Sequence, residues 1–127
     1  VCPPVHWQGS TYLDGGIASP ASADFLLDTG VEEAIVLAPM ASMQMDAPRS
    51  PLAKVERRVR RYMTRIVDRE VAQLRAAGIR VIRIDPGPED LGAFGFNMLD
   101  PARRATVFET ACKTADQAVQ DALRATR

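Results

Sequence analysis

The sequence is poor in cysteine and histidine, and this scarcity excludes two classes of small protein. Its 127 residues include two cysteines, Cys2 and Cys112, and one histidine, His6. Neither a disulfide framework nor a metal site of the usual ligand spacing can be assembled from so few ligands. We therefore expect no metal ion, no cofactor and thiols kept in a reducing compartment, with one pairing between the two cysteines left open.

Long apolar runs are also absent. The most apolar uncharged stretch, residues 34–45, falls short of the roughly 20 residues of a membrane span, and no signal-peptide pattern or internal repeat is present. With 46% hydrophobic and 25% charged residues, the composition is typical of one folded domain spanning residues 1–127. We expect a cytoplasmic protein or one that associates peripherally with a membrane.

Basic residues are missing from the first part of the chain. Residues 1–48 contain no lysine or arginine and have a net charge of −6, whereas residues 49–83 have a net charge of +8. The overall charge of zero therefore hides a basic middle segment, whose partner would be anionic.

Three helix starts are indicated by serine or aspartate followed by proline, because such a cap accepts a free N–H and proline has none to leave unpaired. The pairs are Ser19-Pro20, Ser50-Pro51 and Asp100-Pro101. The first helix is expected to run to about residue 28 and the second to about residue 77, ending at Gly30 and Gly78, and the third runs toward the C-terminus.

Two β-branched segments, residues 34–38 and 79–84, lie between these helices and predict strands. The first is apolar throughout, which is typical of a strand covered on both faces. The alternation of helix and strand predicts an α/β fold, with a parallel sheet flanked by helices. A third, short strand is expected to end at Tyr12-Leu13.

The second predicted helix has one apolar and one basic face. The apolar face, predicted to be core, contains Leu52, Val55, Val59, Tyr62, Met63, Ile66, Val67, Val71 and Leu74. The basic face includes Arg57, Arg58, Arg61 and Arg65, which are either solvated or contact an anionic surface. We expect no nucleic acid partner.

Chemistry is most plausible at Asp14-Gly15-Gly16, which follows the short N-terminal strand and precedes a capped helix start. Ligands of α/β folds bind at strand ends, and the glycines allow a tight turn there. The alternative is that Asp14 is a turn residue that bonds its own backbone.

The segment Pro3-Pro4-Val5, a short turn, Tyr12 to Gly16 and Ser19-Pro20 resembles the second catalytic block of the patatin-like phospholipases. This resemblance implies that the chain is the C-terminal part of a patatin-like α/β/α domain. It also implies a lipid acyl hydrolase with a Ser-Asp dyad, in which Asp14 is the base within the motif Asp14, Gly15 and Gly16. The substrate would be a lipid or another acyl ester.

The nucleophile of such a dyad is absent from this sequence, since no G-x-S-x-G pattern occurs. The resemblance therefore implies that the missing N-terminal half of the same domain supplies the serine, and that residues 1–127 alone are inactive. The alternative function is a non-catalytic α/β module that docks a partner through its arginine-rich helix.

Two loops are candidates for an acyl-chain pocket or lid. Met40, Met43 and Met45 lie in the loop after the first main strand, and thioether side chains adapt to varied apolar ligands. Phe94 and Phe96 lie in a glycine-punctuated loop and either cover the core or line the same pocket. Residues 85–90 are interpreted as a strand-ending turn without function, and His6 as a structural or exposed residue.

Overall fold

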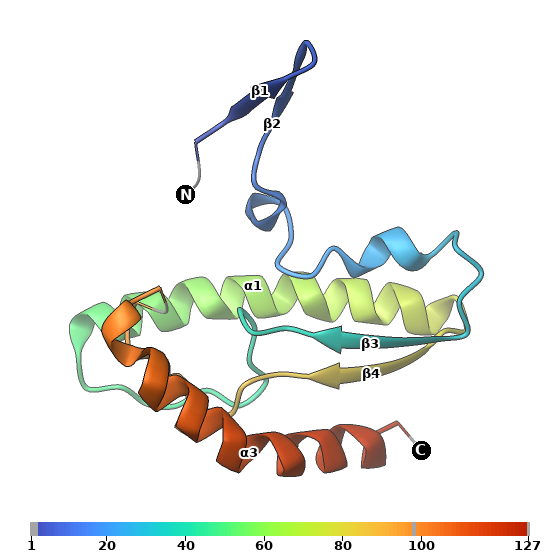
Figure 1. Cartoon of the computed structure of the whole chain (residues 1–127). Helices are drawn as coiled ribbons and strands as arrows, with labels where there is room; N and C mark the ends of the chain where they lie inside the picture. Colours follow the sequence, from blue (N-terminus) through green and yellow to red (C-terminus); the bar gives the residue numbers. More distant parts are fainter. Residues whose placement is uncertain (1–2, 98, 127) are drawn as a thin grey trace.

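The computed structural model describes residues 3–97 and 99–126, which form a mixed α/β structure. Its long helices, α1 (Pro51–Ala76) and α3 (Arg104–Arg124), lie on opposite sides of a parallel strand pair, β3 (Glu33–Leu37) and β4 (Arg80–Ile84) (Figure 1). The remaining elements are shorter. They are β1 (Val5–Trp7), β2 (Ser10–Tyr12), the 3-10 helices η1 (Gly15–Ile17), η2 (Ala23–Leu26) and η3 (Pro101–Arg103), and α2 (Pro88–Phe94).

The two main strands confirm the predicted α/β class with a parallel pairing. Glu33 lies opposite Arg80, and Leu37 lies opposite Ile84. The helix α1 makes the crossover between them, begins at the predicted Pro51 and ends just before Gly78, whose φ of +84° fits the predicted left-handed terminus.

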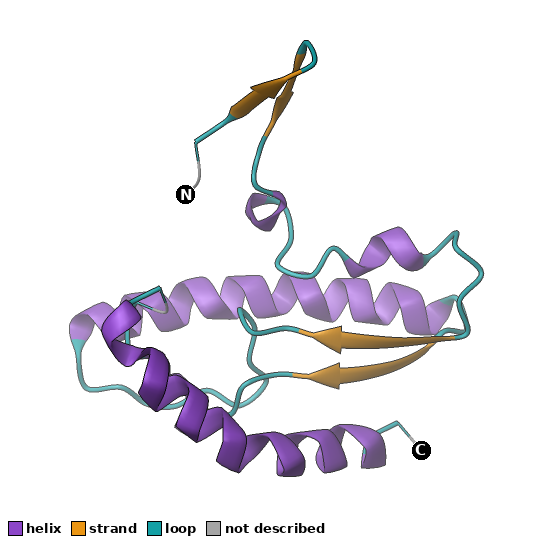
Figure 2. Ribbon diagram, in the orientation of Figure 1, coloured by secondary structure: helices purple, strands orange, loops and turns teal. Residues whose placement is uncertain are grey.

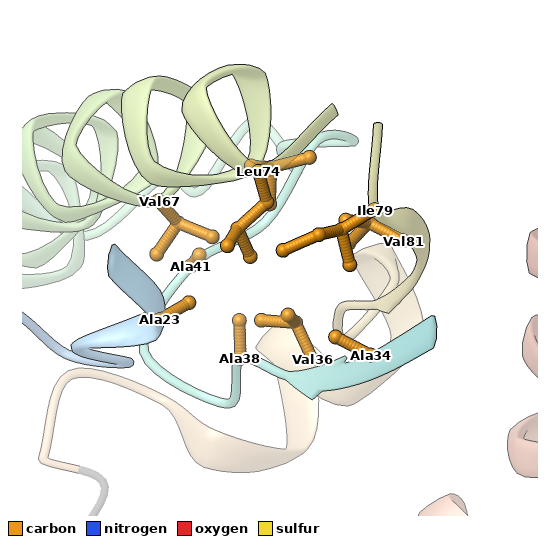
Figure 3. Packing of buried hydrophobic residues seen from close by; sticks show 10 residues of the cluster. Ala23, Ala34, Val36, Ala38, Ala41, Val67, Leu74, Ile79 and Val81 are labelled. Atoms are coloured by element: carbon orange, nitrogen blue, oxygen red, sulfur yellow. The ribbon is translucent and has the colours of Figure 1, made fainter. Parts of the chain in front are cut away.

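The core lies between α1 and one face of this sheet. Val67 and Leu74 of α1 point toward Val36 and Ala38 at the β3 side (Figure 3), and all four are buried. Alanines on the strand side let the helix approach closely, so the core is compact. Truncation of the fully buried Leu74 to alanine should cost about 2–5 kcal/mol.

The opposite face of β3 is not covered, contrary to the expectation from its apolar sequence. Ile35 is 64% exposed and Leu37 66% exposed, whereas Ile82 on the same face of β4 is buried. The reason is that α3 packs on β4 and does not extend over β3. The β3 part of this face is therefore open among the described residues.

The predicted core face of α1 is correct only for the second half of the helix. In the first half Leu52, Val55, Val59 and Tyr62 are exposed, and the buried side is occupied by Arg57, Arg60 and Ala53. The guanidinium groups turn inward because backbone carbonyls of the loop after β3 and of α2 accept their hydrogen bonds.

The N-terminal segment also differs from the prediction. The strand ending near Tyr12 is β2, which pairs antiparallel with β1 in a hairpin that projects from the body and is separate from the parallel sheet (Figure 2). The predicted helix 20–28 is reduced to η2 and adjacent turns. The Ser19 hydroxyl still accepts the N–H groups of Ala21 and Ser22, as expected of a cap.

One helix, α2, was not predicted, and it occupies the segment interpreted as a turn and a loop. Pro88 occupies its first turn, and the Asp90 carboxylate accepts the N–H of Gly87 at 2.9 Å. The third predicted helix is confirmed: the Asp100 carboxylate accepts the N–H of Ala102 at 3.0 Å in η3, which leads directly into α3.

Candidate functional site

Asp14 lies at the turn that follows the hairpin and begins η1. Its Oδ1 accepts the N–H of Gly16 at 2.9 Å, and its carbonyl accepts the N–H of Ile17 at 3.1 Å. The carboxylate is exposed, and among the described residues nothing donates to Oδ2. One carboxylate oxygen is thus fixed by the backbone while the other is available to a hydroxyl.

The two glycines of the motif differ in what the local geometry requires. A Cβ at Gly16 would lie 3.2 Å from Oδ1 of Asp14, which is closer than ordinary van der Waals contact. A Cβ at Gly15 would meet no atom within 4 Å. The missing side chain of Gly16 therefore leaves room for the Asp14 carboxylate. The space around Gly15 would accommodate a Cβ, so this turn does not require glycine there.

The only histidine lies on the hairpin. Nδ1 of His6 is 2.9 Å from the Thr11 hydroxyl, across the strand pair. This side-chain contact agrees with the structural interpretation of His6.

The methionine loop, which follows β3 and contains Met40, Met43 and Met45, borders a large cavity at the carboxyl end of β4. The cavity has a volume of about 1080 Å³ and is lined by Met43, Asp85 and residues of α1, α2 and α3. Met43 is exposed, whereas Met40 and Met45 are half-buried. Asp14 lines neither this cavity nor the smaller one beside it.

A second hollow of about 320 Å³ brings together two groups that the sequence analysis treated separately. Met43 and Met45 line it with Arg61 and Arg65 of α1. Asp68 lines it too, so apolar, cationic and acidic side chains meet at one place on the surface.

The two candidate phenylalanines are not part of either hollow. The ring of Phe94 is half-buried, and the guanidinium carbon of Arg60 lies 5.6 Å from its centroid, a cation–π contact. Phe96 is exposed. The geometry around Phe94 is that of a residue covering a buried arginine.

Arg57 is buried, although the sequence predicted it on the exposed basic face of the helix. It is 2% exposed, forms ion pairs with Asp46 and Glu56, and donates to the carbonyls of Leu91 and Gly95. The hydrogen bonds to Asp46 raise the pKa of Arg57. Arg57 therefore cannot contact an external anionic surface, whereas Arg58, Arg61 and Arg65 are exposed.

Arg60 is the second buried arginine of this half-helix. It pairs with Glu56, its Nη1 donates to the carbonyls of Pro39 and Ala41, and burial lowers its pKa. Arg57 and Arg60 together fasten the loop after β3 and the end of α2 to α1. Their positions on a helix rich in arginine concealed this role in the sequence.

An ion cluster on the wall of the large cavity was also missed. Arg83 donates to both oxygens of Asp85, at 2.9 and 2.7 Å, and to Asp68 at 2.5 Å. Burial opposes the charge of Arg83, but these hydrogen bonds outweigh that effect and raise its pKa. In the sequence, the only signal for this cluster is the spacing Arg-x-Asp at the end of a strand.

The described residues contain no group of three or more acidic, histidine or cysteine side chains placed to bind a metal ion. Within the same ranges, no helix combines the length and apolar character needed to cross a bilayer. Comparison with protein-family models, with curated proteins and with solved structures gives no match to this chain.

Proposed function

We propose that the protein containing this chain is a serine acyl hydrolase of the patatin-like type, which acts on a phospholipid or another acyl ester. Asp14 is the base, and a serine outside residues 1–127 is the nucleophile. The observation that carries the proposal is the state of the Asp14 carboxylate, whose Oδ1 is held by Gly16 while Oδ2 is free to accept a proton.

In this mechanism Oδ2 of Asp14 accepts the serine proton while Oγ attacks the acyl carbonyl. The leaving alcohol takes that proton as its bond to the acyl carbon breaks, and an acyl-serine ester forms. Water then attacks this ester, loses a proton to Asp14 and releases the fatty acid, and the proton returns to serine. The fixed Oδ1 limits rotation of the carboxylate during these transfers.

The open side of the sheet supports the idea that the domain is completed by further strands and helices. Arg80 N donates to Glu32 O, and Ala38 N donates to Ile84 O, so the alternate backbone groups at Ile35 and Leu37 point away from β4. The side chains of Ile35 and Leu37 are exposed as well. An apolar strand with an open edge and an open face is suited to pair with another strand and to be covered by another layer.

The test is Asp14→Asn in the complete protein. The asparagine oxygen can still accept the Gly16 N–H, so the turn is kept and only the base is lost. We expect hydrolysis of phospholipid and of short esters to fall by about 10²–10⁴-fold. The matched control is Asp100→Asn, because Asp100 makes the same type of cap to Ala102 and should retain full activity. Turnover within a few fold of wild type in Asp14→Asn would refute the role of Asp14.

A second function is favoured by two observations. Asp14 already has a structural partner in Gly16, and exposed apolar residues accompany the arginines on α1. In this alternative the chain is a non-catalytic docking module, and Asp14 stabilises only the turn. Asp14→Ala would then lower stability by about 1 kcal/mol, the usual cost of losing such a cap, with no catalytic effect to measure.

A further inference from the structure

The first half of α1 has an exposed surface that combines an apolar stripe with a basic band. The stripe follows three- and four-residue steps, and its members are 50–60% exposed: Leu52, Val55, Val59 and Tyr62. The basic band lies beside it and consists of Lys54, Arg58, Arg61 and Arg65, all exposed. We call these eight residues the outer face of α1.

The cations of the outer face are not neutralised by the protein. None of Lys54, Arg58, Arg61 and Arg65 forms an ion pair with another residue of the described ranges. Glu56 is the one acidic residue between Ala47 and Val67, and its carboxylate is engaged by Arg57 and Arg60. The next acidic residue of α1, Asp68, is engaged by Arg83. The outer face therefore presents uncompensated positive charge next to apolar surface.

We propose that the outer face of α1 binds an anionic lipid surface, with the stripe at the acyl boundary and the basic band at the phosphate groups. This division of one helix into a stripe of large apolar residues and a band of arginine and lysine is typical of helices that lie in the membrane interface. Tyr62 suits that position because its ring is apolar and its hydroxyl is polar.

The neighbouring hollow extends this surface toward the methionine loop. Arg61 and Arg65 of the basic band line the hollow together with Met43 and Met45. Asp68 lines it as well, and its carboxylate pairs with Arg83. A lipid headgroup at these two arginines would therefore have apolar side chains beside it for the start of an acyl chain. This feature favours lipid over nucleic acid, whose backbone offers charge without a matching apolar part.

The inference goes beyond the proposed hydrolysis and does not depend on Asp14. Membrane binding is measured as sedimentation with vesicles, and ester hydrolysis is measured separately on soluble short-chain esters. Loss of one of these properties leaves the other unaffected, so the failure of either proposal can be recognised.

The experiment is co-sedimentation of the complete protein with vesicles of phosphatidylcholine alone or with 30% phosphatidylglycerol. We expect binding to the anionic vesicles only, and weaker binding at high salt. Arg58→Gln, Arg61→Gln and Arg65→Gln combined should weaken it on the order of 100-fold, since each arginine near an anionic surface contributes roughly a fivefold gain. Val55→Gln with Val59→Gln should also weaken it, at unchanged net charge.

The matched controls remove the same number of cations and of apolar side chains from α3. Arg104→Gln, Lys113→Gln and Arg124→Gln combined remove three exposed cations, and Phe108→Gln with Val119→Gln removes two exposed apolar side chains. Both controls should bind like wild type. Equal binding to both vesicle types, or wild-type binding by both α1 variants, would overturn the proposal. The protein could instead form a dimer in solution that dissociates in the variant Val55→Gln with Val59→Gln, while vesicle binding stays unchanged. That result would assign the stripe to contact with a second copy of the chain.

Discussion

Arg57 of α1 and Asp46 of the loop after β3 form a two-bond ion pair, in which Nε donates to Oδ1 at 2.5 Å and Nη2 donates to Oδ2 at 3.0 Å. The same guanidinium donates to Leu91 O and Gly95 O. One side chain thus joins three segments that are distant in sequence, and it shapes the loop that contains the methionines.

We expect Arg57→Met to be strongly destabilising, by about 3 kcal/mol or more, because it leaves the Asp46 carboxylate and the carbonyls of Leu91 and Gly95 without their donor in a buried place, while Glu56 keeps Arg60. The neighbouring Arg58→Met should change the free energy of unfolding by less than about 0.5 kcal/mol, since Arg58 is exposed. Urea denaturation followed by far-UV circular dichroism measures both. Similar losses in the two variants would show that the buried pair does not stabilise the fold.

The same pair predicts a pH dependence. Its hydrogen bonds from Arg57 hold the pKa of Asp46 below the ordinary value of 3.8. At a pH between the lowered pKa of Asp46 in the folded protein and its ordinary pKa in the unfolded chain, the unfolded chain binds the proton and the folded chain does not. The stabilisation is therefore complete above the ordinary value and is lost as the pH falls through the lowered one. Wild type should lose more stability than Asp46→Asn on acidification below about pH 4, and parallel losses would contradict this assignment.

The two acidic partners of Arg83 should differ in importance. The Asp85 side chain is 4% exposed and accepts two hydrogen bonds, whereas the Asp68 side chain is 52% exposed and accepts one. We expect Asp85→Asn to cost about 3 kcal/mol and Asp68→Asn at most about 1 kcal/mol, because solvent screens the exposed pair. Thermal and urea unfolding of the two variants, compared side by side, would reject this ranking if the costs were equal or reversed.

Substitutions on the two faces of β3 test whether one face is open. In residues 1–127, Ile35→Ser should cost less than about 1 kcal/mol, because the side chain is mostly in water. Val36→Ser on the buried face should cost about 2–4 kcal/mol. If the complete protein covers this sheet as proposed, Ile35→Ser becomes as costly as Val36→Ser there. Equal costs already in residues 1–127 would contradict the open face.

Met43 provides a prediction about substrate length. It is exposed and lines both hollows beside the methionine loop. If this loop holds an acyl chain, Met43→Asp in the complete protein should reduce kcat/KM for long-chain esters at least tenfold more than for short-chain esters, because only a long chain would reach the new charge. Equal losses on both substrates would exclude the role, and Met40, which is half-buried and lines neither hollow, offers a comparison site.

Local signals explain which parts of the fold could be predicted. The strands β3 and β4, the limits of α1 and the start of the third helix follow from β-branched runs, Ser-Pro and Asp-Pro pairs and Gly78, and all these signals act between near neighbours. The helix α2 was missed because Gly92 and Gly95 weakened its pattern, and because Arg57 of α1 and Thr114 of α3, which donate to Leu91 O and to the Asp90 carboxylate, are distant in sequence.

The arrangement of side chains was harder to predict, because it depends on contacts between distant segments. Periodicity showed that α1 has an apolar stripe, but the side of the helix that is buried was decided by carbonyls at Pro39, Ala41 and Leu91, which attract Arg57 and Arg60. The position of Asp14 in a turn was predictable from its glycines. Its catalytic role is an inference from resemblance that the Asp14→Asn experiment tests.

The projecting hairpin has a practical consequence for spectroscopy. It carries Trp7, the single tryptophan of the sequence, which is 61% exposed and 6.4 Å from the ring of Tyr12. Tryptophan emission therefore reports on the hairpin and not on the packing of α1 against the sheet. A blue shift of that emission would indicate that another polypeptide or a lipid has covered the segment leading to Asp14.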